Sequence, residues 1–187
     1  MGFSMPQLCF EENDRLDITE YTQAAMVTAS IAMMRVLEEN GIKPDVAAGL
    51  SLGEYCALAA AGVMSDEDAI RTVRQRGILM QEAVPVGEGA MAAILALDAS
   101  AIEEVTGAME GVWIANYNCP GQIVISGEKA AVEDACEKLK AAGAKRAVML
   151  NVSGPFHSGM LADAGERLGE VLSRWSFMSR RFLMWPM

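Results

Sequence analysis

Hydrophobic positions recur with two different periods along the chain, and the period changes near residue 89. Before that point, apolar residues return every three or four positions, as on one face of an amphipathic helix. The pattern predicts three helices, over residues 17–41, 54–61 and 65–83. Between the first two helices, residues 45–49 form a short apolar run that ends in glycine, which predicts a buried strand meeting a tight turn.

Polar residues at the expected starts of two of these helices provide capping groups. Asp17 and Glu20 stand three positions apart, as in a capping box. Ser65 precedes three acidic residues and has the side-chain oxygen that an N-cap needs. We therefore expect both helices to begin with a side-chain cap.

From Gly89 onward, short apolar runs alternate with polar segments of helical period. The predicted elements are strands over residues 91–97, 112–117, 122–126 and 146–152, and helices over 100–109, capped by Ser100, and 128–142. This order, β-α-β-β-α-β, is that of a ferredoxin-like unit. We predict an α/β protein in which a ferredoxin-like subdomain, residues 89–152, is inserted into a body formed by residues 1–88 and 153–187. The tail, residues 174–187, lacks the periodicity that precedes it.

The chain has 187 residues, of which 52% are hydrophobic and 21% charged, the balance of a folded domain with a small insert. Its 15 basic and 25 acidic side chains give a net charge of −10, which repels nucleic acid and anionic lipid surfaces. No window of about 18 residues is apolar throughout, and the start lacks the basic and apolar segments of a secretory signal. We expect a cytoplasmic protein with no membrane or nucleic-acid partner.

Four cysteines, Cys9, Cys56, Cys119 and Cys136, stand far apart, and His157 is the only histidine. These spacings match neither a zinc site nor a disulfide framework. We expect no bound metal, and we interpret the cysteines as reduced thiols that are mostly buried.

Residues 49–53 match the G-x-S-x-G motif, in which small flanking residues allow a sharp turn between a strand and a helix. Such a turn would lift the hydroxyl of Ser51 out of the backbone and present it as a nucleophile. The following helix would point its first amide groups at the site, so the N–H of Leu52 is a candidate for one half of an oxyanion hole. The alternative is a glycine-rich turn that only packs a helix onto a sheet.

A serine nucleophile needs a base, and His157 is the one histidine that could supply it. It lies in a Gly-Pro loop after the last predicted strand, and loops of this kind often present functional side chains. The alternative is a structural or solvated histidine.

Three arginines, Arg71, Arg74 and Arg76, lie on the helix predicted over residues 65–83. A guanidinium that faced the nucleophile could hold a carboxylate through two parallel hydrogen bonds, which lysine does less well. Spacing alone does not select one of the three, and the alternative is that all are solvated surface residues.

Five motifs occur in one order between residues 49 and 158, and together they resemble malonyl-CoA:acyl carrier protein transacylases. The resemblance covers residues 8–172. The motifs are residues 49–55, 74–77 with 80–83, 89–93, 116–122 and 154–158. The resemblance implies an α/β-hydrolase-like body that carries a ferredoxin-like insert, in agreement with the predicted order of elements.

The resemblance implies an acyltransferase of fatty acid biosynthesis that needs no bound cofactor. Ser51 would take malonyl from coenzyme A as a covalent ester, with His157 as its general base, and the malonyl would then pass to the phosphopantetheine thiol of acyl carrier protein. Arg76 occupies the position of the family arginine that pairs with the free malonyl carboxylate. Its charge would select a dicarboxylic half-ester over acetyl.

Three further positions acquire roles through the resemblance. Phe156 matches malonyl-preferring relatives, in which a bulky ring crowds out an α-branch. Asn116 and Asn118 match an Asn-x-Asn motif, and we expect them to brace the loop that frames the site.

The chain departs from the family pattern in three places. Leu50 stands where relatives usually have histidine. The family's opening strand, whose Gly-Gln-Gly-x-Gln motif supplies the glutamine side of the oxyanion hole, has no counterpart here. Relatives also continue beyond the tail, residues 174–187, so the resemblance implies a chain truncated at both ends.

Two other functions remain open at this point. An α/β-type serine esterase would also have a G-x-S-x-G motif followed by a histidine, with Asp98 or Asp134 as the acid. A catalytically impaired fragment would only bind acyl carrier protein. It would bind the acidic carrier protein through a local basic patch, which we predict around four residues: Arg71, Arg74, Lys145 and Arg146.

Overall fold

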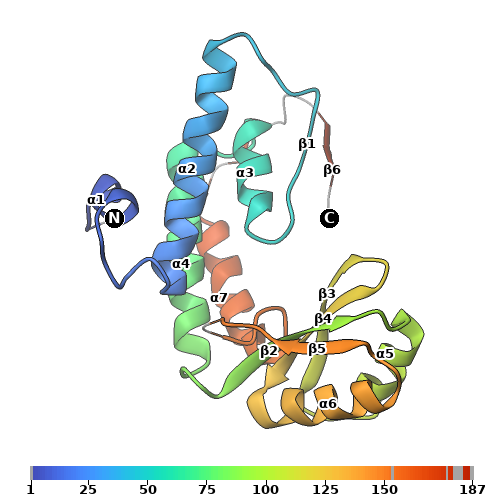
Figure 1. Ribbon diagram of the computed structural model, residues 1–187. Helices are drawn as coiled ribbons and strands as arrows, with labels where there is room; N and C mark the ends of the chain where they lie inside the picture. The colour runs from blue at the N-terminus through green and yellow to red at the C-terminus, as the bar shows by residue number, and fades with distance from the viewer. Residues whose placement is uncertain (1, 153, 176, 179–182, 186–187) are drawn as a thin grey trace. The chain divides into compact units, whose positions relative to one another are not determined.

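The chain folds as an α/β protein, and the computed structural model describes residues 2–152, 154–175, 177–178 and 183–185 (Figure 1). It divides into two compact units, which are residues 1–79 with 167–187, and residues 80–166. The predicted insert, residues 89–152, falls inside the second unit. The tail predicted over residues 174–187 lies partly outside the described residues.

Helices dominate the first unit. Its elements are α1 (Met5–Phe10), α2 (Thr19–Glu39), β1 (Val46–Ala48), α3 (Gly53–Ala60), most of α4 (Asp66–Ala83), the end of α7 (Ala162–Leu172) and β6 (Leu183–Trp185). β1 and β6 pair in parallel, with Val46 opposite Leu183. The strand β6 lies in the tail, where the sequence pattern predicts no element.

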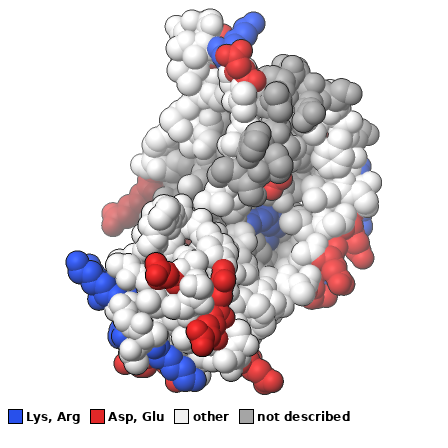
Figure 2. Space-filling view, turned by 90° about the vertical axis from the view of Figure 1, so that its right-hand side faces the viewer, with Lys and Arg blue, Asp and Glu red and all other residues white. Residues whose placement is uncertain are grey.

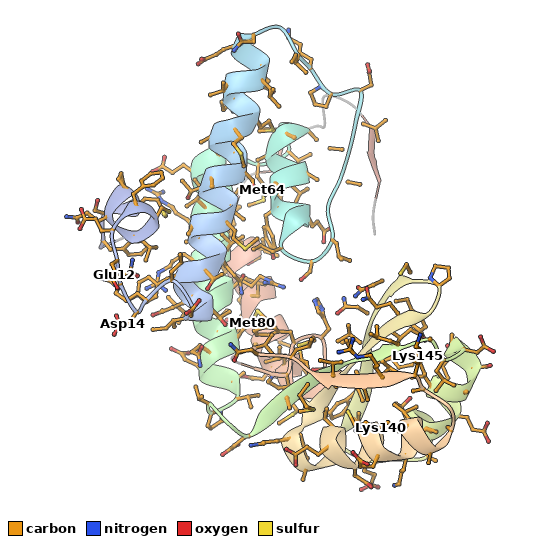
Figure 3. The ribbon with its side chains drawn as sticks, viewed as in Figure 1. Glu12, Asp14, Met64, Met80, Lys140 and Lys145 are labelled. Carbon is orange, nitrogen blue, oxygen red and sulfur yellow. The ribbon has the colours of Figure 1, made fainter. Side chains whose placement is uncertain are left out.

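Three helices of this unit, α2, α3 and α4, contribute to one apolar core. Its buried side chains are Val27, Ile31, Tyr55, Ala59, Met64, Ala69 and Val73. All of them except Met64, which lies between α3 and α4, are on the helices and recur four residues apart. Met64, labelled in Figure 3, is 3% exposed. A Cβ on Gly77 would lie 2.5 Å from the Cα of Glu20, so only glycine lets α4 approach the start of α2 this closely.

Of the helix caps predicted for α2 and α4, one is confirmed and the other is wrong. Ser65 accepts a hydrogen bond from the N–H of Asp68 at 3.0 Å, which confirms it as the cap of α4. The capping box predicted for α2 from Asp17 and Glu20 is wrong, because Ile18 is the N-cap residue and makes no side-chain bond. Glu20 forms an ion pair with Arg74 of α4, so a contact between helices replaces the predicted local bond.

The strand β1 is less buried than its apolar sequence predicts. Val46 is 56% exposed, and Ala48 is exposed as well. Strands of parallel sheets are normally covered on both faces and flanked by further strands. Among the described residues, β6 is the only strand that pairs with β1. The prediction of a strand is confirmed, and the prediction of its burial is wrong.

The second unit is a four-stranded antiparallel sheet with two helices packed on one face (Figure 1). In chain order its elements are β2 (Gly89–Leu95), α5 (Ala99–Gly107), β3 (Val112–Cys119), β4 (Gln122–Glu128), α6 (Lys129–Ala141), β5 (Arg146–Met149) and the 3-10 helix η1 (Gly159–Leu161). The strands lie in the order β3-β4-β2-β5. The four strands and two helices predicted for this region are present, with boundaries that differ by a few residues.

Alternate residues of the central strands form the core under these helices. Ala92 and Ile94 of β2 and Ile125 of β4 are fully buried in one cluster with Val132 and Leu139 of α6. A period of two in the strands and of three to four in the helix brings these apolar faces together.

Local details of the second unit differ from the prediction. α5 begins at Ala99, with Asp98 at its N-cap and no side-chain cap bond, so the predicted cap by Ser100 is wrong. β5 ends at Met149, three residues earlier than the apolar run suggests.

The four cysteines are free thiols. Cys136 is buried, Cys9 and Cys56 are half-buried and Cys119 is exposed, so the prediction that they are mostly buried is wrong. Burial raises the pKa of the Cys56 and Cys136 thiols. In the described part of the chain, no three His, Cys, Asp or Glu side chains gather as metal ligands would, and no helix is long and apolar enough to cross a membrane.

Candidate active site

Ser51 occupies the turn between β1 and α3. Its backbone φ is +50°, in the left-handed region that a residue with a side chain rarely adopts. Two backbone hydrogen bonds close the turn, from Gly53 N–H to Leu50 O at 2.9 Å and from Glu54 N–H to Ser51 O at 3.2 Å. Strand, sharp turn and helix are the context in which a G-x-S-x-G serine acts as a nucleophile.

The first glycine of the motif, Gly49, is required by the backbone. A Cβ there would lie 2.0 Å from the carbonyl oxygen of Gly53 and 2.3 Å from the nitrogen of Glu54. The second glycine has open space around it, since no atom lies within 4 Å of a Cβ built on Gly53. Only the first glycine therefore permits the close backbone approach that forms the turn.

Leu52 is the N-cap residue of α3, and its side chain packs half-buried against the core of the first unit. The first amide groups of a helix have no acceptor within the helix and lie at the positive end of its dipole. Such groups stabilise negative charge that develops beside them. The position of Leu52 suits the oxyanion role predicted for its N–H.

Arg76 is the arginine that contacts the candidate nucleophile. Its Nη2 donates to Ser51 Oγ at 3.1 Å, and its Nη1 donates to Gln23 Oε1 at 2.6 Å. Burial lowers the pKa of the guanidinium, while the nearby side chains of Tyr55 and Glu54 act in the opposite direction. A largely desolvated positive charge next to a serine hydroxyl suits a substrate with a carboxylate close to its reacting carbon.

The other two arginines of α4 have carboxylate partners. Arg74 forms an ion pair with Glu20, and its guanidinium lies 4.6 Å from the ring centroid of Tyr21. Arg71 pairs with Glu67 at 2.6 Å on the exposed face of the helix. The structure therefore distinguishes three arginines that spacing alone leaves equivalent.

Gln23 is the residue that sequence reasoning missed. It lies on α2, is only 5% exposed and accepts the hydrogen bond from Arg76. It is spaced four residues from Val27, which is four residues from Ile31, so all three share the buried face of the helix. The sequence held one signal for this residue, which is a polar amide on the same helix face as two apolar core residues. Such a position predicts a buried side chain with a specific hydrogen-bond partner, because buried polar groups need one.

His157 lies in the second unit, in the loop between β5 and η1. Its φ is +59° and the residue is exposed. Two glycines let this loop pack closely on its own unit. A Cβ on Gly89 would lie 2.4 Å from Cδ of Pro155, and one on Gly159 would lie 2.7 Å from Cζ2 of Trp113. The loop is thereby held against β2 and β3, with His157 at its exposed turn.

The other predicted site residues of the second unit lie in the same loop or in the β3–β4 hairpin. Phe156 is half-buried, directly before the histidine. Asn118 Nδ2 donates to Gln122 Oε1 at 3.4 Å across the hairpin. Asn116 is half-buried beside an irregularity in the β3 register, opposite Val124.

The structure thus brings Ser51, Leu52 and Arg76 together in the first unit and adds Gln23 to them. His157 and the remaining predicted site residues belong to the second unit. A pairing of Ser51 with His157 joins the two units and is therefore a proposal.

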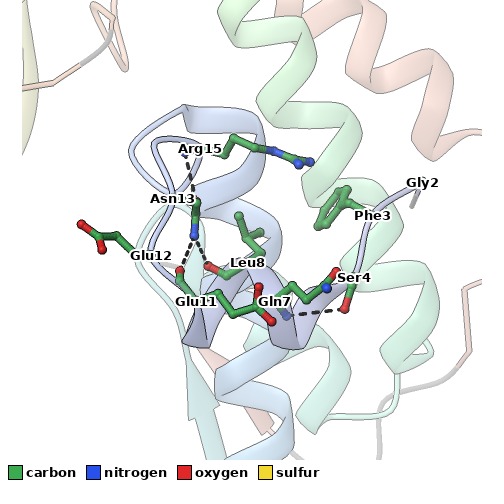
Figure 4. A pocket seen from close by; sticks show the side chains of 9 residues that line it. All are labelled: Gly2, Phe3, Ser4, Gln7, Leu8, Glu11, Glu12, Asn13 and Arg15. Atoms are coloured by element: carbon green, nitrogen blue, oxygen red, sulfur yellow. Dashed lines mark hydrogen bonds between the residues drawn. The ribbon is translucent and has the colours of Figure 1, made fainter.

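A separate cavity of about 330 Å³ lies beside α1 (Figure 4). Asn13 shapes one wall, because its Nδ2 donates to the carbonyl oxygens of Leu8 and Glu11 and its Oδ1 accepts from the N–H of Arg15. The lining contains none of the predicted site residues. These contacts stabilise the N-terminal segment.

The four residues predicted to form a docking patch for acyl carrier protein belong to different units. Arg71 and Arg74 lie in the first unit, both in ion pairs, whereas Lys145, labelled in Figure 3, and Arg146 lie in the second. The face of the molecule in Figure 2 carries acidic as well as basic side chains. The ion pairs of Arg71 and Arg74 weaken the case for those two as a docking surface.

Comparison with known families gives the class of this protein. A family model described as "Acyl transferase domain" matches residues 1–185. The chain belongs to the acyl transferase domain family. The match is longer than the motif-based resemblance, which covers residues 8–172, and it includes most of the tail.

Curated proteins similar to this chain include malonyl CoA-acyl carrier protein transacylases. The one from Bacillus subtilis (strain 168) is 54% identical over 173 residues, which are 90% of this chain and 55% of that protein. The one from Staphylococcus aureus (strain COL) is 42% identical over 176 residues, 92% of this chain and 56% of the relative. The chain spans about half the length of the curated relatives that it matches.

Solved structures of similar proteins share the fold. A complex described as PlMCAT:AntF (holo), a type II PKS acyl-carrier protein with its malonyl-transacylase, matches with a TM-score of 0.94 at 44% identity, over 98% of this chain and 61% of that one. MCAT from Streptococcus pneumoniae matches with a TM-score of 0.93 at 44% identity, over 99% of this chain and 62% of that one.

Proposed function

We propose that this chain transfers malonyl from malonyl-CoA to the phosphopantetheine thiol of acyl carrier protein, in fatty acid biosynthesis. The observation that carries the proposal is the 3.1 Å contact between Arg76 Nη2 and Ser51 Oγ. A malonyl group has a single carbon between its reacting carbonyl and its free carboxylate. An acyl group on Ser51 would therefore bring this carboxylate to the guanidinium. The names of the relatives support the same substrates.

In the first half-reaction, Ser51 Oγ attacks the thioester carbonyl of malonyl-CoA while His157 takes the hydroxyl proton. The C–S bond breaks, the proton passes to the leaving sulfur, and coenzyme A departs as a thiol. Ser51 then carries malonyl as an ester. The N–H of Leu52 stabilises the negative charge that develops on the carbonyl oxygen.

In the second half-reaction, the phosphopantetheine thiol gives its proton to His157 and attacks the ester carbonyl. The bond between the carbonyl carbon and Ser51 Oγ breaks, and Oγ regains the proton from His157. One thioester replaces another, so the reaction needs no bound cofactor or metal. The main requirement is that water stays away from the ester.

The remaining predicted residues have supporting roles in this proposal. Phe156 precedes the base and limits the space for a branched acyl group. Asn116 and Asn118 brace the β3–β4 hairpin that frames the site, and the bond from Asn118 to Gln122 supports this role.

We also propose the finer fold assignment made from the sequence. The element order and the strand order β3-β4-β2-β5 support a ferredoxin-like subdomain over residues 89–152. The sequence of β1, the Ser51 turn and α3 supports an α/β-hydrolase-like body over residues 1–88 and 153–187. A cytoplasmic location stays a prediction from the sequence.

A serine esterase is less well supported. A generic esterase has no need of an arginine beside its nucleophile, and the chain belongs to an acyl transferase family. Of the two acids proposed for an esterase, Asp134 pairs with Lys138 on the exposed surface of α6 at 2.8 Å, and Asp98 is the exposed N-cap residue of α5.

The test is the intact mass of the purified protein after incubation with malonyl-CoA. We expect a malonyl adduct on the wild type that is absent from Ser51→Ala. In Arg76→Ala, the rate of labelling by malonyl-CoA falls and labelling by acetyl-CoA is tolerated, because the carboxylate has lost its partner.

Controls separate the alternatives. An adduct that hydrolyses within seconds without an acceptor thiol would favour an esterase. A folded chain that forms no adduct but binds acyl carrier protein, with the same affinity in Ser51→Ala, would be a binding fragment and would overturn the transfer reaction for this chain.

A further inference from the structure

The arginine beside the candidate nucleophile differs from its neighbours in the kind of partner it has. Arg35 is held by Asp66 and Glu38, Arg71 by Glu67, and Arg74 by Glu20. In each of these cases a carboxylate neutralises the guanidinium.

Arg76 is instead held by two neutral groups, the amide of Gln23 and the hydroxyl of Ser51. The described residues include no carboxylate in an ion pair with it. Glu54 is near enough to act on its pKa, yet the dominant influence on that pKa is burial. The positive charge is therefore desolvated without being neutralised.

The partner on α2 is itself firmly placed. Gln23 is 5% exposed and lies on the same helix face as Val27, which is fully buried. Its Oε1 can accept a hydrogen bond but carries no negative charge. A 2.6 Å bond to this oxygen fixes one edge of the guanidinium and leaves its charge for a third group.

We infer that Gln23 is a positioning residue that determines specificity: its neutral amide holds Arg76 in place while leaving the charge of Arg76 available to the free carboxylate of the acyl group. The inference rests on the proposed function. It assigns a role that a carboxylate at the same position could not fill. Glutamate has the same length and shape as glutamine, and it would pair with Arg76 within the protein. The substrate carboxylate would then have to displace a bound anion.

The experiment compares rates of covalent labelling by malonyl-CoA and acetyl-CoA, followed by intact mass, in the wild type, Gln23→Glu and Gln23→Met. In Gln23→Glu, we expect the ratio of malonyl to acetyl rates to fall by roughly tenfold or more, because the internal carboxylate occupies the guanidinium. In Gln23→Met, which removes the acceptor but adds no charge, malonyl labelling slows and the preference for malonyl remains.

Gln7→Glu is the matched control, since it makes the same chemical change at an exposed position of α1. It leaves the ratio unchanged. Thermal midpoints of all variants show whether each remains folded. If the role of Gln23 were merely structural, Gln23→Glu would slow both substrates equally and leave the ratio of rates unchanged.

The possible failures are distinguishable. A wild type that labels with neither substrate, or that labels with both equally, overturns the proposed function and this inference with it. A wild type that prefers malonyl while Gln23→Glu keeps the same ratio overturns the inference alone.

Discussion

The two glycines that flank Ser51 have different surroundings, although the motif treats them alike. A Cβ on Gly49 would collide with the backbone of Gly53, and a Cβ on Gly53 would meet nothing. The turn therefore depends on one glycine for its geometry and tolerates a side chain at the other.

We predict that Gly49→Ala destabilises the protein by about 1–3 kcal/mol, the usual range for a forced overlap with atoms that cannot move away. It also abolishes the malonyl adduct, since Ser51 follows two residues later. Thermal unfolding and intact mass check the two parts. Gly53→Ala is the matched control and keeps both stability and adduct. A Gly49→Ala protein that behaves like the control would contradict the steric argument.

Site residues differ in how far the sequence could predict them. Ser51 stands out because a motif fixes its local turn, and that turn is confirmed by a positive φ. The choice of Arg76 among three arginines came only from resemblance, because the partners that distinguish them lie on α2 and in the Ser51 turn. Gln23 was missed for the same reason, since its partner is 53 residues away in sequence.

Helix caps illustrate the same limit at the level of elements. Ser65 caps α4 because its acceptor and the donor on Asp68 belong to one turn of chain. Ser100 has the same residue type and an equally suitable sequence, yet α5 begins one residue before it. Small shifts of a helix start decide whether a polar residue serves as a cap.

We predict that Ser65→Ala lowers the free energy of unfolding by about 1 kcal/mol, because the N–H of Asp68 loses its acceptor. For a chain of this size the midpoint of thermal unfolding falls by about 2–4 °C. Ser100→Ala is the control, since no cap bond is lost, and its midpoint stays within the error of measurement. Equal shifts in the two variants would show that the Ser65 bond contributes nothing.

The elements of the second unit were predicted more closely than those of the first. Alternate residues of its central strands belong to the core under the helices, and the helices are short and close in sequence to the strands that they cover. The burial of β1 was predicted wrongly because it depends on strands elsewhere in the chain. No local pattern reports how many neighbours a strand has.

Across the molecule, the outward face of α2 carries apolar side chains where a surface helix normally carries polar ones. Met26, Met33 and Leu37 lie on one stripe of the helix and are 57%, 63% and 49% exposed. Contiguous exposed apolar surface promotes association between molecules.

We predict that Met33→Lys combined with Leu37→Lys increases the monomer fraction at high protein concentration, because charge on the stripe opposes contact between copies. Size-exclusion chromatography over a range of concentrations measures the effect. Val86→Lys, at a loop residue that is 75% exposed and lies outside α2, is the control for added charge. If the control and the double variant dissociate alike, net charge and not the stripe governs association.

Ser51 and His157 both hold backbone angles that glycine adopts without strain. Glycine at either position would relax its turn, and it would remove the group proposed to do the chemistry. A gene copy released from selection for acyl transfer would therefore gain a less strained backbone by the same substitution that removes its chemistry.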